Sequence, residues 1–177
     1  AAGLYTEESL EKMWAAARVE AFGYGKWTRI EEIMAFCHEC HYSNLGIAFC
    51  AGLSEEAETA AKILRSNGFT VNSVCCKNCS VPKESVGISP DSTVSGGKEY
   101  EAMCNPAGQA VFLERAGCQL AIILGLCVGH DSAFIQRFSG PITILSAKDR
   151  ATGNNPLASI YTANSYYKRQ YSFLKAN

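Results

Sequence analysis

The feature that most constrains the fold is the segment AIILGLCVGHD at residues 121–131. Its first part is an uninterrupted apolar run of strand length, which is typical of a parallel β-strand that is buried on both faces. Gly125 follows the run, and a helical pattern then starts at Asp131 and continues to Phe138. This succession of buried strand, tight turn and helix predicts an α/β fold.

Further strands and helices alternate along the chain. Apolar runs at 45–52, 69–76 and 141–150 predict three more strands, and helical patterns over 54–67 and 107–116 lie between them. Strand–helix–strand units of this kind are right-handed and give parallel sheets. We therefore expect a single three-layer α/β domain with a four-stranded parallel sheet in the order 2-1-3-4.

Two amphipathic helices precede the first strand. Apolar residues recur at helical spacing over 7–22 after Thr6, a suitable N-cap, and a second helical pattern covers 28–41. We expect these N-terminal helices, within residues 1–42, to pack on a sheet domain formed by 43–177. The whole chain, residues 1–177, would then be one domain.

Two segments do not follow the strand–helix alternation. Residues 77–99 are rich in Ser, Pro and Gly and predict a long loop. Loops of this length inside a compact domain are usually functional or mobile. Residues 163–174 predict a terminal helix, whose tyrosines pack against the domain or cover the surface of a homo-oligomer. The tyrosines of this region are Tyr161, Tyr166, Tyr167 and Tyr171.

The composition argues against several classes of function. Hydrophobic residues make up 47% and charged residues 19% of the chain, and the net charge is −1. There is thus no basic surplus to indicate binding to nucleic acid or to an anionic membrane. No apolar run reaches the roughly 18 residues of a transmembrane helix, and no secretory signal pattern opens the sequence. We expect a cytoplasmic protein that binds neither nucleic acid nor membrane.

The nine cysteines are many for a chain of 177 residues. A chain of this length can be stable through its core, so a disulfide scaffold is not expected. In a reducing cytoplasm, clustered cysteines indicate metal or redox chemistry. The alternative is that they are buried, inert thiols, because free Cys behaves as a small hydrophobic residue. The number of cysteines alone does not decide between these alternatives.

The expected topology brings several cysteines to one place. All strands of a parallel sheet end at the same edge, where the following helices begin, and ligands bind there at the switch point of the strand order. Cysteines follow the first, second and third strands, and another precedes a helix that starts at this edge. We therefore expect a metal site formed by Cys50, Cys76, Cys104, Cys127 and His130.

Charged residues flank these thiols. Lys148 and Arg150, at the end of the fourth strand, could hold an anionic ligand or offset thiolate charge, and Asp149 could orient a neighbour. A solvated strand end is the alternative. Asp131 could act likewise on His130, or it caps its own helix. If the site is catalytic, the candidates are Cys127, His130, Lys148 and Asp149.

Two other cysteine motifs are weaker indications of a site. CHECH at 37–41 places two thiols and His41 on one helical face, a geometry that can bind metal, but at the opposite edge of the sheet. We interpret it instead as a partly exposed helix end. Residues 76–79 form a CxxC motif like those of dithiol redox enzymes. This motif leads into a loop and does not open a helix, so a loop thiol is the preferred interpretation of Cys79.

Several segments resemble a known family. They are LGIAFCAGL, SVCCK, MCNPAGQA, GLCVGHDS, KDR and NNPLASIYT. The likeness extends over roughly residues 28 to 170, and the family is an uncharacterised one of metal-binding proteins found largely in anaerobic bacteria and archaea. It implies metal binding without an established reaction. The matching candidates are Cys50, Cys76, Cys104, Asn105, Cys127, His130, Asp131, Lys148, Asp149 and Arg150, of which Asn105, Asp131 and Arg150 are assigned to cofactor binding.

The sequence therefore predicts metal binding at the carboxyl edge of a parallel sheet. Cysteines with one histidine suit zinc or an Fe–S cluster, and the anaerobic distribution of the family favours iron. One alternative is a metal-free thiol enzyme with Cys127 or Cys104 as nucleophile and His130 as base. Another is a module for small anions, although no GxGxxG or P-loop pattern is present. A small anionic ligand or a redox partner protein is the expected partner.

Overall fold

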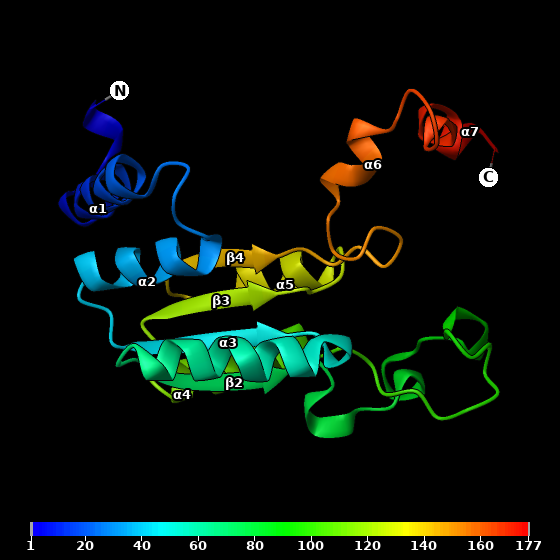
Figure 1. Ribbon diagram of the computed structural model, residues 1–177. Helices are drawn as coiled ribbons and strands as arrows, with labels where there is room; N and C mark the ends of the chain where they lie inside the picture. The colour runs from blue at the N-terminus through cyan, green and yellow to red at the C-terminus, as the bar shows by residue number, and fades with distance from the viewer. Residues whose placement is uncertain (1, 177) are drawn as a thin grey trace.

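A computed structural model describes residues 2–176 and shows an α/β fold around a four-stranded parallel sheet (Figure 1). Residues 1 and 177, at the ends of the expected domain, lie outside this range. The strand order is β2-β1-β3-β4, so the switch point lies between β1 and β3. The predicted fold class and strand order are confirmed. The strands are β1 (Asn44–Phe49), β2 (Thr70–Cys75), β3 (Leu120–Leu124) and β4 (Ile142–Ser146).

Helices cover both faces of the sheet. On one face lie α2 (Arg29–Glu39) and α3 (Ser54–Ser66), and on the other α4 (Pro106–Arg115) and α5 (His130–Arg137). The first helix, α1 (Glu7–Gly23), packs on α2. Among the described residues, no helix is both long and apolar enough to cross a membrane.

The alternation of side chains along the strands separates two apolar cores. Leu45 and Ile47 of β1 point into the core beneath α2 and α3, whereas Ala48 points into the core beneath α4 and α5. Because successive strand residues face opposite sides, Cys50 shares the face of Ala48. Cys76 lies in the same core. The face of the sheet that carries α4 and α5 therefore carries both cysteines.

The N-terminal helices begin where the sequence predicts. The Thr6 side chain accepts a hydrogen bond from the backbone of Ser9 (3.2 Å), and Thr28 forms a capping box with Glu31. The second helix, however, ends at Glu39, and its expected extension to residue 41 is wrong. His41 adopts a φ of +55°, in the left-handed region, which ends a right-handed helix.

The predicted terminal helix over 163–174 is also wrong. The chain there forms the short helix α6 (Leu157–Tyr161), a series of turns, a 3₁₀ segment (Lys168–Ser172) and α7 (Phe173–Ala176). Tyr161, Tyr166 and Tyr171 are between 68% and 78% exposed. Since short helices depend on burial of an apolar face, a segment that buries so little gains little from becoming one continuous helix.

The predicted long loop is present and extends further than expected, from residue 77 to 104, just before α4. It folds on itself. Short 3₁₀ turns at Asn78–Ser80, Lys83–Val86 and Pro90–Ser92 alternate with extended stretches. Glu101 ties the loop together, because its carboxylate forms an ion pair with Lys83 and accepts a hydrogen bond from the backbone N–H of Val94 (2.8 Å). The loop is thus a structured cover beside the carboxyl edge of the sheet (Figure 1).

The turn after β3 can be tested with two glycines of matched backbone. Gly125 (φ +67°) and Gly153 (φ +66°) are both left-handed, but only at Gly125 would a Cβ approach a neighbour closely, 2.1 Å from Leu53 Cδ1. The left-handed backbone costs each alanine variant about 1–2 kcal/mol. In Gly125→Ala, overpacking adds roughly 1–3 kcal/mol. Urea unfolding should therefore show a lower midpoint for Gly125→Ala than for Gly153→Ala. Equal midpoints would contradict this packing of the turn.

Candidate functional site

Backbone hydrogen bonds continue the sheet past the ends of its strands. The N–H of Cys76 donates to the carbonyl of Phe49 (2.8 Å), and the N–H of Cys50 donates to the carbonyl of Leu124 (3.1 Å). Both cysteines directly follow a strand, so these bonds place them at the same edge. The N–H of Gly125 extends the series to β4, donating to Ser146 (2.7 Å).

A separate set of polar contacts brings Cys104 to this edge. The N–H of Asn105 donates to the carbonyl of Cys76 (2.8 Å). The side chain of Asn78 donates to the carbonyls of Cys75 and Asn105, each at 3.0 Å. Asn105 in turn caps α4 by accepting from the N–H of Gly108 (2.9 Å). The start of α4 is thereby held against the end of β2.

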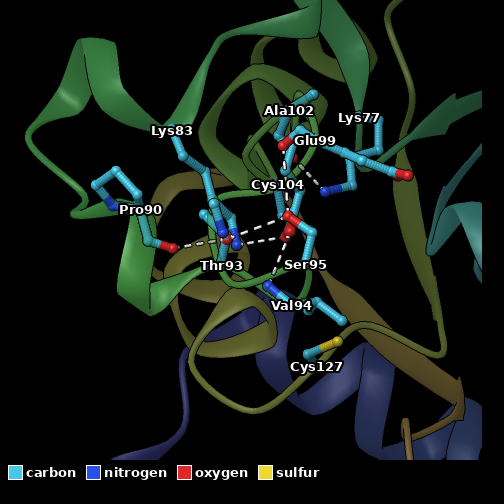
Figure 2. A network of polar contacts seen from close by, with 12 residues as sticks. Lys77, Lys83, Pro90, Thr93, Val94, Ser95, Glu99, Ala102, Cys104 and Cys127 are labelled. Carbon is cyan, nitrogen blue, oxygen red and sulfur yellow. Dashed lines mark hydrogen bonds and ion pairs between the residues drawn. The ribbon is translucent and has the colours of Figure 1, made fainter.

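Four of the cysteines that were predicted as metal ligands line one pocket of about 770 Å³ beneath the long loop. The expected metal ligands all line this pocket, and so do Lys148 and Arg150. Figure 2 shows Cys104 and Cys127 with loop residues Lys83 and Val94 around the same space. The thiols are those of Cys50, Cys76, Cys104 and Cys127, and His130 lines the wall as well.

Cys76 and Cys104 form a closely coupled pair. Their sulfur atoms lie 3.8 Å apart, at hydrogen-bonding distance, and Cys76 is only 2% exposed. The contact with Cys76, aided by the charge of Lys77, lowers the pKa of Cys104 to about 7. The same contact, together with burial, raises the pKa of Cys76. Cys104 is therefore the member of the pair that ionises first.

Cys127 and His130 occupy the turn between β3 and α5. Arg150 donates a hydrogen bond to the Cys127 sulfur (3.2 Å), and this contact raises the pKa of the guanidinium. Burial, and then the charge of Lys77, lowers the pKa of His130. A lowered pKa keeps the imidazole neutral near pH 7, and the neutral imidazole is the form that binds metal.

Gln109 stabilises the strand ends next to the site, and it is not among the residues predicted from the sequence. It is fully buried in α4, and its side-chain N–H groups donate to the carbonyls of Phe49 (3.2 Å) and Val74 (2.7 Å). It thereby joins the ends of β1 and β2 just before their cysteines. The sequence did contain a sign of this role, because Gln109 is a polar residue on the inward face of a predicted helix, within the motif MCNPAGQA.

Three of the predicted polar candidates lie outside the pocket lining. Asn105 caps α4, as described above. The Asp131 carboxylate accepts hydrogen bonds from two nearby backbone N–H groups (3.0 and 2.7 Å), and Asp149 does the same in the turn after β4 (2.9 and 3.1 Å). The structure thus shows these side chains ordering the local backbone.

The cysteines of the two weaker motifs do not reach the pocket. Cys37 is fully buried in the opposite core, and burial raises its pKa to about 12. Cys40 and His41 line a different hollow, beside α1. Cys79 is exposed and is not part of the pocket lining, whereas Cys76 is. All nine cysteines are free thiols, so the CxxC motif does not form a disulfide here.

The loop supplies pocket residues that sequence reasoning did not identify. Lys77, Lys83 and Glu101 are the charged ones, and the loop adds apolar side chains. Lys77 had a local signal, because it directly follows Cys76 in the motif SVCCK. The others reach the pocket only because the loop folds back across it. The remaining loop residues of the lining are Ile88, Ser92, Val94 and Met103.

One pair of thiols, Cys76 and Cys104, has the sulfur–sulfur distance expected of two ligands of one metal ion. Within residues 2–176, no three Cys, His, Asp or Glu side chains converge closely enough to hold an ion as they stand. Two sulfur ligands of a tetrahedral ion, with metal–sulfur bonds of about 2.3 Å, lie about 3.8 Å apart. The sulfur atoms of Cys76 and Cys104 already have this separation of 3.8 Å.

Fold and pocket together define an α/β protein with a cysteine-lined pocket at the switch point of a parallel sheet. Residues 1–145 match the family described as "Protein of unknown function (DUF1847)", and the chain belongs to this family. The expected resemblance to an uncharacterised family with archaeal members is confirmed. Lys148 and Arg150 lie beyond the matched residues.

One relative matches most of the chain. The protein is 44% identical, over 164 residues, to an uncharacterized protein of Methanocaldococcus jannaschii. The match covers 93% of this chain and 81% of that relative. No solved structure matches the chain.

The lowered pKa of Cys104 predicts a pH profile for alkylation. A thiolate reacts and a thiol does not, so the rate rises as the pH rises through the pKa. In metal-free protein, labelling of Cys104 by iodoacetamide should be half-maximal near pH 7, as its pKa of about 7 requires. Cys37, with a pKa of about 12, should stay unlabelled in the folded protein. Peptide mass spectrometry measures both. A midpoint for Cys104 at or above that of an ordinary cysteine would contradict the coupling to Cys76.

Proposed function

We propose that this protein binds a metal ion or an Fe–S cluster in the pocket at the carboxyl edge of its sheet. Cys50, Cys76, Cys104 and Cys127 would be the ligands, with His130 as a further donor. The observation that carries the proposal is the 3.8 Å separation of the Cys76 and Cys104 sulfur atoms, since two ligands of one tetrahedral ion need this spacing.

The set of donors suits thiophilic metals. Structural zinc is bound by four ligands from cysteine and histidine, and Fe–S clusters are held by cysteine thiolates. Both need deprotonated sulfur, and Cys104 loses its proton near neutral pH. The backbone N–H of Ala51 donates to the Cys76 sulfur (3.3 Å). Hydrogen bonds to ligand sulfur stabilise the thiolate and tune a bound cluster.

The charges around the thiols support the same proposal. Four thiolates in a half-buried pocket repel one another unless positive charge compensates them. Arg150 contacts Cys127 directly, and the charge of Lys77 favours the thiolate of Cys104. When bound, the metal would supply the remaining positive charge and could act as a Lewis acid or an electron carrier.

The ionised Cys104 also supports a second candidate, a metal-free thiol enzyme with Cys104 as nucleophile. The expected base, His130, gives this candidate less support. Within the described residues its imidazole makes no hydrogen bond to a thiol, and the lowered pKa makes it a weaker base. The first candidate uses all four thiols, whereas the second leaves three of them without a role.

The test is metal content after anaerobic purification. Wild-type protein should contain stoichiometric zinc, or iron with acid-labile sulfide and a visible absorption band. Cys104→Ser and Cys127→Ser should each lose most of this metal, since each removes one ligand. The matched control is Cys40→Ser, which removes a half-buried thiol outside the pocket and should keep the metal. Metal-free wild-type protein in which Cys104 alone is alkylated rapidly would instead favour the thiol enzyme.

A further inference from the structure

The pocket is much larger than a metal site requires. Its volume of about 770 Å³ lies within the range of about 300–1,000 Å³ that is typical of small-molecule sites. A metal ion or cluster would lie among the sulfur atoms of its ligands, at one side of this space. The rest of the pocket is lined by side chains that are not metal ligands, and their chemistry indicates what else the pocket can hold.

The lining carries an excess of positive charge. It contains Lys77, Lys83, Lys148 and Arg150 but, among the described residues of the lining, only one carboxylate, that of Glu101. A divalent ion with four thiolates has two net negative charges. Even then one positive charge remains uncompensated, and without metal the excess is larger. A positive excess is therefore present with or without the metal. Its reduction to a single charge, on which the choice of ligand below depends, rests on the proposed metal site.

Lys148 is the cation available to a ligand. Lys83 is paired with Glu101, Lys77 donates to the carbonyl of Ala102, and Arg150 donates to Cys127. For Lys148 the described residues provide neither an ion pair nor a side-chain hydrogen bond, although it is half-buried. Its stem passes over the turn after β3, with Cε 3.6 Å from the position of a Cβ on Gly125.

Part of the pocket lining is apolar. The half-buried Ile88 and Met103 of the loop contribute to it, together with the buried Pro106 at the start of α4, and Val94 also lines the pocket although it is 94% exposed. The carboxylate of Glu101 fixes the backbone of Val94 (2.8 Å). A ligand in this pocket can therefore contact both a cation and apolar side chains, the combination typical of sites for small organic molecules.

We propose that the pocket binds a small organic carboxylate, with its charge paired to Lys148 and its apolar part against the loop. A carboxylate carries one negative charge at neutral pH and so matches the single surplus positive charge of the metal-loaded pocket. A phosphate ester carries nearly two charges and would overcompensate it. The loop from residue 77 to 104 thus forms part of a ligand site.

Calorimetric titration with hexanoate tests this proposal, with hexan-1-ol and inorganic phosphate as probes of the apolar and charged parts alone. Hexanoate should bind, and the other two should bind more weakly. Lys148→Met keeps most of the stem but removes the charge, and it should weaken hexanoate binding by about tenfold or more. Lys168→Met, at an exposed lysine outside the pocket, should bind like wild type. Circular dichroism checks that both variants fold.

Four results would overturn the proposal. They are no binding of hexanoate to wild type, equal binding of hexan-1-ol, equal binding of inorganic phosphate, and unchanged binding of hexanoate by Lys148→Met. Metal content is measured in the same samples, so that the two proposals can fail separately. Metal-free protein that binds hexanoate in a Lys148-dependent manner would refute the metal and keep the ligand site. Metal-loaded protein that does not bind hexanoate would support the metal site and refute the ligand site.

Discussion

The candidate site depends on backbone hydrogen bonds that run across the sheet one residue beyond its strands. The bonds from Cys50 to β3 and from Cys76 to β1 place thiols from two segments side by side, and the bond from Asn105 to Cys76 adds a third. Main-chain bonds of this kind are insensitive to the identity of the side chains. The edge is therefore a backbone frame that sets where the cysteines lie, and the side chains around them then set their chemistry.

Two features of the pocket have opposite effects on the ionisation of its thiols. Burial disfavours a thiolate, whereas a hydrogen bond to the sulfur or a nearby cation favours one. At Cys104 the contact with Cys76 and the charge of Lys77 outweigh burial, and the pKa falls to about 7, while at Cys37 burial is the main cause and raises the pKa to about 12. Two cysteines of one chain thus differ by a large factor in reactivity because of what surrounds them.

Much of this arrangement could be predicted from the sequence, because apolar runs locate strands and parallel topology gathers the strand ends. That reasoning placed Cys50, Cys76, Cys104 and Cys127 on one edge, and all four line the pocket. It could not place Lys83 or Glu101, since their positions depend on how a loop without hydrophobic periodicity folds on itself. It also misjudged the terminal segment, where helical spacing exists but no partner surface stabilises a helix.

The pocket is assembled from segments spread over most of the chain, from Cys50 after β1 to Arg150 after β4. During synthesis on the ribosome, a nascent chain that has emerged only as far as α4 offers Cys50, Cys76 and Cys104 but neither Cys127 nor the basic residues of β4's end. The complete pocket therefore exists only after the residues that follow β4 have been translated, and a cofactor that needs both Cys50 and Cys127 could not be acquired before β3 and the turn after it have emerged.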